Sequence, residues 1–416
     1  MQEEHLEDAA FLFQQWEEAL RSPEYTLEEI ADGPEGRLLA HLDGLVLGGA
    51  AVAEKLLVPA LGGDEPGAVF AAAFALLCSE DGDFTPAVLE ALAAAEDEPR
   101  RALRRGLAVA PVEGLAQRLA GLAAGAAQPD LLEVLAARGV DPALPLDGLA
   151  AADDPVQQAL ALRLARAFRG RLSPLALERG YRSEEPEVRA AALESGMALG
   201  HPGAWSACEA TVAARGPGFA SAALLLGLSG DARSAAALTP ALREPEHAAA
   251  AAFALGFSGQ VSAAEALLPL LRDGKLAPLA LEAFAAITGL PLTPAHLGAP
   301  ERWDPEQEDG AEPGYGPEAE LPAPAPEAVS VWWQEARQRL APGQRWLRGA
   351  PWSAGGLLRE LSEGPARRRE ALALELAIRS RGQAAVTWDA LTQRQREELA
   401  AARGLAGRLP GRGFGE

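Results

Sequence analysis

Runs of alanine and leucine that open with a proline, in about half of the copies after acidic residues, and that close with a glycine in several copies, are the most regular pattern in this chain. The clearest copy opens at Glu185-Pro186, includes Leu193 and reaches its glycine at Gly200. Proline suits the first helical turn because its missing N–H would have no partner there. A carboxylate before it caps free amides, and a glycine after the last turn adopts the left-handed conformation that ends a helix. The pattern therefore predicts a short, well-delimited helix.

The same unit recurs at intervals of 26 to 33 residues. The prolines that open the predicted helices are Pro34, Pro66, Pro99, Pro129, Pro155, Pro186, Pro217 and Pro245. The predicted glycine stops keep the same phase and lie at Leu199-Gly200, Leu226-Gly227 and Leu255-Gly256, each with a second glycine three residues later. A period near 30 residues with two helices per unit is typical of an α-solenoid. We therefore predict an all-α fold, with N-terminal helices and an array of HEAT-like helical-pair repeats over residues 1–289.

The pattern changes twice after this array. Residues 290–326 are rich in proline, glycine and glutamate and have almost no hydrophobic periodicity, which predicts an acidic, disordered loop. Helical periodicity returns in residues 327–416, which form a divergent C-terminal module rich in arginine and tryptophan. Its predicted helices cover residues 329–340, 354–361, 365–379 and 387–402. Near the N-terminus, Thr26 and Glu29 have the spacing of a capping box.

The charge of the chain follows the same division. Residues 328–416 contain 15 arginines and 9 acidic residues, whereas the whole chain has a net charge of −22. So acidic a chain is a poor general partner for nucleic acid or for an anionic membrane surface. The first residues lack the basic and then apolar order of a signal peptide, and the longest apolar runs are shorter than a membrane span. We expect a soluble, cytoplasmic protein.

No residue pattern indicates a catalytic, cofactor or metal site, and none is predicted. Cys78 and Cys208 lie in separate apolar stretches and read as buried core residues. The histidines are dispersed along the chain, and capping or surface roles are favoured over metal binding for them. His41 is the histidine of most interest, because it lies in the distinctive segment of residues 40–45. The arginine stripe over residues 100–105 could face DNA, as in repeat glycosylases, but ion pairs within the molecule are the favoured explanation.

Segments at the two ends of the chain resemble a known family. Trp16, residues 25–27 and the sequence Ala-His-Leu-Asp-Gly-Leu at 40–45 are similar to the start of a proteobacterial family of HEAT-repeat proteins, and residues 331–333, 342–349 and 367–377 are similar to its C-terminal pattern. Genes of that family are often found near type VI secretion loci, and no activity is assigned to it. The repeats between these ends also resemble phycobilisome-lyase-type HEAT repeats. The resemblance implies a bacterial, cytoplasmic accessory of a secretion system.

Two functions follow from the sequence. The first is a non-enzymatic protein–protein interaction scaffold, such as an adaptor, chaperone or immunity-type protein, and the second is a HEAT-like enzyme of the lyase or DNA-glycosylase type with an unlocated active site. Tryptophan and arginine are enriched at interaction hot spots. The predicted contributors to a protein-binding surface are Trp332, Trp333, Arg345, Trp346 and Arg348. The alternative is that the tryptophans belong to a cap on the end of the solenoid.

Overall fold

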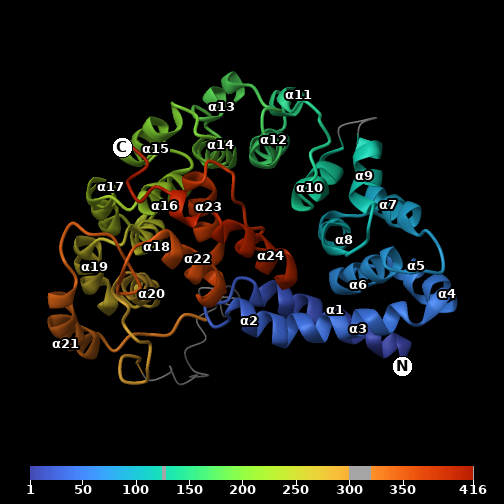
Figure 1. Cartoon of the computed structure of the whole chain (residues 1–416), viewed down its shortest axis with the longest axis horizontal. Helices are drawn as coiled ribbons and strands as arrows, with labels where there is room; N and C mark the ends of the chain where they lie inside the picture. Colours follow the sequence, from blue (N-terminus) through green and yellow to red (C-terminus); the bar gives the residue numbers. More distant parts are fainter. Residues whose placement is uncertain (124–127, 299–319, 416) are drawn as a thin grey trace.

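The computed structural model describes residues 1–123, 128–298 and 320–415, and these form a curved, all-helical array (Figure 1). The predicted all-α solenoid is confirmed. The array begins with the N-terminal elements α1 (Gln2–Ala19), α2 (Leu27–Ile30), the π-helical turn η1 (Ala31–Glu35), α3 (Gly36–Val46), α4 (Gly49–Val52), η2 (Ala53–Leu57) and α5 (Val58–Ala60). Thr26 and Glu29 form the predicted capping box at the start of α2.

The repeats follow in two layers. The inner layer contains α6 (Pro66–Leu77), α8 (Asp97–Val109), α10 (Pro129–Ala137), α12 (Pro155–Ala167), α14 (Pro186–Leu199), α16 (Phe219–Ser229), α18 (Ala248–Ser258) and α20 (Ala277–Thr288), and each helix packs on the next. The outer layer contains α7 (Thr85–Ala94), α9 (Leu115–Ala123), α11 (Asp147–Ala150), α13 (Pro174–Gly180), α15 (Ala204–Ala214), α17 (Ala232–Leu238) with η3 (Thr239–Arg243), and α19 (Val261–Leu267) with η4 (Leu268–Arg272). Leu193 of α14 is fully buried between the layers, as its helical phase predicts.

The predicted proline positions hold for half of the inner helices. Pro66, Pro129, Pro155 and Pro186 are each the first residue of their helix. Before Pro66, the Glu65 carboxylate accepts hydrogen bonds from the amides of Gly67 and Ala68, as a helix cap should. The other four prolines deviate. Pro99 is the third residue of α8, Pro217 and Pro245 lie in turns before α16 and α18, and Pro34 lies inside η1.

Two of the predicted glycine stops are wrong. Gly227 and Gly256 lie inside α16 and α18, and the stops are the second glycines, Gly230 and Gly259, which have left-handed backbone angles. The internal glycines are points of close approach between inner helices. A Cβ atom on Gly227 would lie 2.1 Å from the carbonyl oxygen of Ala254 in α18. Helix contact, rather than helix termination, therefore explains a glycine at this position.

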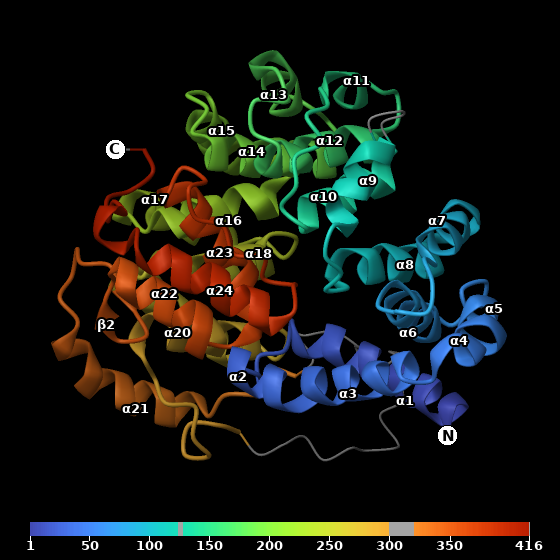
Figure 2. The ribbon, with the colours of Figure 1, turned by 45° about the vertical axis from the view of Figure 1, so that its right-hand side comes forward.

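Only the first part of the C-terminal module lies at the end of the array, where Trp333 packs on Phe284 of α20, the last inner helix. After α21 (Pro326–Ala336) and η5 (Arg337–Arg339), the chain turns into the concave side of the array and continues there (Figures 1 and 2). Its elements are the hairpin β1 (Trp346–Leu347) and β2 (Ala350–Pro351), α22 (Ala354–Glu363), η6 (Ala366–Arg368), α23 (Arg369–Arg379), α24 (Thr392–Arg403) and η7 (Ala406–Arg408). Helix α23 packs on α14 and α16, and α22 and α24 reach α2.

The predicted acidic loop is only partly within the described residues. Residues 299–319 lie outside them. The described flanks, residues 290–298 and 320–326, are mixed: residues 291–295 are exposed, but other residues pack on the array, which the prediction of a disordered loop did not include. Leu290 and Leu321 are buried, and Leu297 pairs with Pro324 in an isolated β-bridge. Leucine residues at both flanks of the loop are buried, although the polar residues around them leave no hydrophobic pattern in the sequence.

Candidate binding groove

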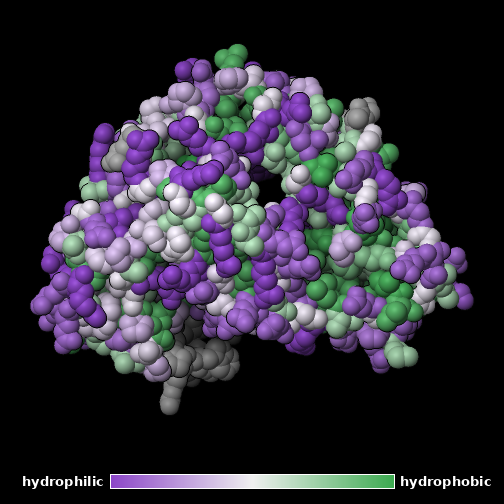
Figure 3. Space-filling view, viewed as in Figure 1, coloured by the Kyte–Doolittle hydropathy of each residue, from purple (hydrophilic) through white to green (hydrophobic). Residues whose placement is uncertain are grey.

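Helix α8 presents one face to the concave side of the array, and this face is the floor of a groove. Glu98, Arg101, Ala102, Arg105, Ala108 and Val109 follow one another at helical spacing, and all of them line cavities. Arg105 lines both cavities. We name the two cavities together the α8 groove. Figure 3 shows the molecule hollowed between the C-terminal module and the middle of the array.

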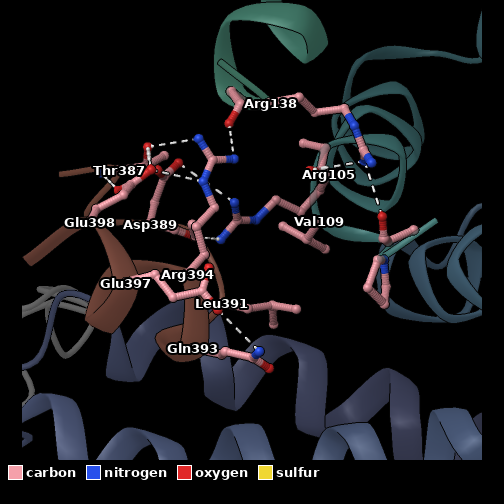
Figure 4. Close-up of a pocket in the computed structure, with 15 residues that line it drawn as sticks. Arg105, Val109, Arg138, Thr387, Asp389, Leu391, Gln393, Arg394, Glu397 and Glu398 are labelled. Carbon is pink, nitrogen blue, oxygen red and sulfur yellow. Dashed lines mark hydrogen bonds and ion pairs between the residues drawn. The ribbon is translucent and has the colours of Figure 1, made fainter. Parts of the chain in front are cut away.

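One part of the α8 groove lies between α8, the start of the α8–α9 connection, the end of α10 and the C-terminal module (Figure 4). This part has a volume of about 460 Å³. Its apolar surface comes from Val109, Pro111 and Leu391, and its polar surface includes Thr387, Gln393, Glu397 and Glu398. Three segments that are far apart in the sequence, residues 105–111, 137–138 and 387–398, thus form one concave site.

The other part lies between α1, α6 and α8 and has a volume of about 320 Å³. Phe13 supplies an aromatic wall, which is fixed by stacking on Phe70 with ring centroids 4.1 Å apart. Gln14 and Glu98 are exposed at this part of the groove. The cavity therefore combines an apolar wall with polar groups that solvent can reach.

Arg105 separates the two parts and ties three elements together. Its Nε donates to Glu17 Oε1 of α1 at 2.7 Å, and its Nη2 donates to the backbone oxygen of Asp389 in the C-terminal module. Its guanidinium also lies over the ring of Trp16, 4.5 Å from the centroid. The side chain is thus held on both sides, and the groove is a fixed feature of the fold.

The arginine stripe on α8 is paired within the molecule, as predicted. Arg100 lies 3.7 Å from Asp130, and Arg104 pairs with Asp130 and Glu133 on α10. The partners come from neighbouring helices rather than from the acidic residues that precede the stripe. These ion pairs join α8 to α10 on one side and to α1 on the other.

Two further arginines bind the walls of the groove to each other. Arg138, at the end of α10, donates to the backbone oxygens of Leu107, at 2.7 Å, and of Ala110, at 3.0 Å, so it satisfies carbonyls at the C-terminal end of α8. Arg394 of α24 donates in turn to the backbone oxygen of Ala137 at the end of α10. Burial lowers the pKa of Arg138, and the charge of nearby Arg394 lowers it further.

Next to the groove, the N-terminal and C-terminal parts of the chain are joined by a buried carboxylate. Glu35 of η1 accepts hydrogen bonds from the backbone N–H and hydroxyl of Thr392, at the start of α24, and from Trp16 Nε1 at 3.0 Å. A carboxylate at a helix N-terminus satisfies free amides and complements the dipole. Burial raises the pKa of Glu35 even though these hydrogen bonds and the charge of Arg396 oppose the shift. The pairing places α24 against the N-terminal helices.

The five residues predicted to bind a partner lie outside this groove, at the far end of the array. Trp333 is buried against Phe284 of α20, and Trp332 is partly buried beside it. Trp346 is buried and donates from Nε1 to the backbone oxygen of Ala341.

The two predicted arginines differ in exposure. Arg345 forms a bidentate ion pair with Glu375, at 2.6 and 3.1 Å, and also donates to the backbone oxygen of Phe257. Arg348 has an exposed side chain, 3.6 Å from Glu360. Packing thus accounts for Trp333, Arg345 and Trp346, and partner binding stays a prediction for Trp332 and Arg348.

His41 lies beside His5, with their Nδ1 atoms 3.3 Å apart and Asp8 3.5 Å away. Among the described residues no group of three or more histidine, cysteine or carboxylate side chains is arranged to hold a metal ion. Cys78 and Cys208 are both free thiols, Cys208 is buried, and burial raises the pKa of both.

Sequence reasoning missed the α8 groove. The arginine stripe marked α8 as unusual, but its groove-lining partners come from α1, α6, α10 and α24. Only the meeting of both ends of the chain brings them together. No sequence signal marked the contact between these two ends, in which Ala366 N–H donates to Tyr25 O and Arg367 N–H donates to Ser22 O.

Comparison with protein-family models finds no match to this chain. No curated protein is significantly similar to it. In the parts of the chain that the structure describes, no single helix is long and apolar enough to cross a membrane. The helices α15 and α16 meet that test only when they are taken together, and they are bent by 120° relative to each other.

Proposed function

We propose that this protein is a non-enzymatic scaffold that holds a segment of a protein partner in the α8 groove. The observation that carries the proposal is how the concave side is divided. The C-terminal module covers the inner helices from α14 to α20, whereas the inner face of α8 remains open and is lined on both sides. Solenoids use concave faces of this kind to bind partners.

The dimensions of the groove suit a peptide segment. From Glu98 to Val109 the floor of the groove is about 16 Å long, at 1.5 Å per helical residue. About five residues of extended chain cover that length, at 3.3 Å per residue. The two cavities are of the size that holds individual side chains or a small ligand. The described residues that line them include no histidine, cysteine or serine, which supports binding over nucleophilic chemistry.

The setting of this scaffold is proposed from the resemblance alone. A cytoplasmic accessory of a type VI secretion system would need to recognise a segment of another protein, and the α8 groove offers a place for one. The groove lies near the contact between the N-terminal and C-terminal parts of the chain that Glu35 and Thr392 make. An adaptor, chaperone or immunity-type role is proposed on the resemblance and on this open groove.

Site-specific cross-linking tests the proposed function. A photoreactive amino acid at Ala108, inside the groove, should cross-link one partner in cells of the source organism. The same amino acid at Ala400, exposed on α24 outside the groove, should not. With the purified partner, Ala108→Trp should lower affinity at least tenfold, and Ala400→Trp should leave it unchanged. Equal effects of the two tryptophan substitutions would refute the proposal.

A further inference from the structure

Of the four arginines that line the α8 groove, Arg105, Arg138 and Arg394 are engaged by the protein itself, whereas Arg101 is exposed and lies 3.8 Å from Glu17. Arg138 donates only to backbone oxygens of residues 107–112, and Arg394 donates to Glu398, Thr387 and Ala137. Arg105 is held by Glu17 and Asp389. A guanidinium that is already bound to several acceptors has little left to offer a ligand. The charges of Arg105, Arg138 and Arg394 therefore stabilise the fold instead of selecting a partner, and of the four guanidinium groups that of Arg101 alone is exposed.

Two carboxylates that line the groove, in contrast, remain accessible to solvent. Glu98 is exposed, and no ion pair or hydrogen bond of its carboxylate is found within the described ranges. Glu397 is exposed on the C-terminal module, where its carboxylate accepts one hydrogen bond, from Gln393 at 3.2 Å. These two carboxylates belong to opposite parts of the groove. A ligand lying along the whole groove would meet an available carboxylate in each part.

The overall charge agrees with this local balance. Six carboxylates and four guanidinium groups line the α8 groove, namely Glu17, Glu65, Glu98, Asp389, Glu397 and Glu398 against Arg101, Arg105, Arg138 and Arg394. The whole chain carries −22. Such a field attracts cations over a distance and increases their rate of association. An acidic segment would instead be repelled before it reached the groove.

We infer that the occupant of the α8 groove is a basic, extended segment of a protein partner, an inference that rests on the proposed function. Lysine or arginine side chains of the segment pair with Glu98 and Glu397. Small apolar side chains between them pack on Phe13 in one part, and on Val109 and Leu391 in the other. The segment is extended because the two parts follow one face of α8 and meet at Arg105, which is fixed between α1 and the C-terminal module.

Synthetic peptides test this inference with the full-length protein. The probe is a fluorescent seven-residue peptide in which lysines alternate with small apolar residues, and its counterparts carry glutamine or glutamate instead of lysine. Fluorescence anisotropy should show the lysine peptide binding at least tenfold more tightly than either counterpart. The double variant Glu98→Gln with Glu397→Gln should reduce this affinity at least tenfold. The control Glu187→Gln with Glu335→Gln removes two exposed carboxylates elsewhere and should have little effect.

The possible outcomes separate the inference from the proposed function. If the control weakens binding as much as the groove variant, the lysine peptide is attracted by overall charge, and the inference is overturned. If the glutamine peptide binds as well as the lysine peptide and Ala108→Trp blocks both, the groove binds peptides but does not select basic ones. If the lysine peptide shows no binding up to millimolar concentration, the inference also fails, while the cross-linking result decides the proposed function independently.

Discussion

Arginine side chains bind the ends of the inner helices to their neighbours. Guanidinium groups repeatedly satisfy the carbonyls that the end of a helix leaves without partners. Arg379 donates to Leu228 and Ser229 at the end of α16, Arg368 donates to Gly256 near the end of α18, and Arg169 donates to Ala198 near the end of α14. The sequence shows that the C-terminal module is rich in arginine. It does not show which of these arginines face inward, because that depends on where the module packs.

Glu375 forms ion pairs with Arg345 and Arg379, and all three side chains are almost completely buried. Burial opposes the charged form of Glu375, but the two guanidinium groups outweigh it and lower the pKa of the carboxyl. Arg379 also lies over the rings of Trp352 and Phe414, 4.5 and 4.9 Å from their centroids. The cluster fixes the C-terminal module to the end of α16 and to the last residues of the chain.

Removing Arg379 should be strongly destabilising. In Arg379→Ala, Glu375 keeps only one guanidinium and the carbonyls at the end of α16 lose their donor, so we expect a loss of about 3–5 kcal/mol in the free energy of unfolding. Arg403→Ala, an exposed arginine on α24, is the control and should change stability by less than about 0.5 kcal/mol. Urea unfolding measures both. A loss below about 1 kcal/mol for Arg379→Ala would mean that the cluster is solvated.

Glu35 makes the closure of the chain sensitive to pH. Because its pKa is raised in the folded protein, the folded state holds a proton that the unfolded state loses first as the pH rises. Its contribution to stability is therefore complete below the unfolded pKa and is lost as the pH rises through the folded pKa. Glu35→Gln cannot ionise. The stability of the wild type relative to Glu35→Gln should decrease as the pH rises from below the ordinary glutamate pKa, about 4.5, as followed by urea unfolding at each pH. A constant difference would show that Glu35 titrates alike in both states.

At the scale of the element, the sequence was most informative where a rule is local. A proline at the first helical position and a glycine at the last act through the backbone of their own helix, so Pro186 and Gly200 could be placed from the sequence. Gly227 was misread because its reason lies in another helix: a side chain there would collide with Ala254 of α18. The hairpin of β1 and β2 was missed for a similar reason. Its strands have two residues each, and they are held by backbone bonds to Gly259 and to the end of α20.

Gly227→Ala should distinguish contact from termination. Alanine normally favours a helix over glycine by about 0.5–1 kcal/mol, but here its Cβ would lie 2.1 Å from the carbonyl oxygen of Ala254. Forcing α16 and α18 apart should cost about 1–3 kcal/mol. The matched control is Gly355→Ala in α22, where no atom lies within 4 Å of the added carbon, and it should be neutral or stabilising. Thermal or urea unfolding compares the two, and stabilisation of both variants would contradict the close approach.

At the scale of the whole molecule, the prediction of a solenoid was right, but the predicted separation of array and C-terminal module did not reveal how they join. In a solenoid each repeat contacts mainly its neighbours, so the sequence specifies how adjacent repeats pack better than it specifies the overall curvature, which is the sum of many small rotations between repeats. That sum decides whether the concave side is wide enough to accept other helices. Here α22, α23 and α24 occupy much of it and reach α2 at the opposite end. The α8 groove forms because the C-terminal module packs into the concave side, so no local sequence pattern predicts it.

This closure should make the array unfold as one unit. The buried residues form two large clusters, one built mainly from the N-terminal half and one from the C-terminal half, and the indole of Trp388 packs against both. Repeats of an open solenoid can unfold separately, whereas a solenoid whose two ends are joined by packed helices should unfold in one cooperative transition. We expect amides of α1 and of α20 in the wild type to exchange hydrogen with similar free energies of opening, because both ends are tied to the same module.

Trp388→Ala removes the side chain shared by the two clusters and should separate them. Truncation of a large, partly buried aromatic residue costs up to about 3–5 kcal/mol, and much of that loss should appear as weaker coupling between the halves. Native-state hydrogen exchange should then show α1 and α6 opening at a lower free energy than α18 and α20. The control Val156→Ala removes an exposed side chain on α12 and should leave the two ends equally protected. If α1 and α20 lose protection in parallel in Trp388→Ala, the halves are joined by contacts other than this indole, such as the hydrogen bonds of Glu35 to Thr392, and the same measurement on Thr392→Val would identify them.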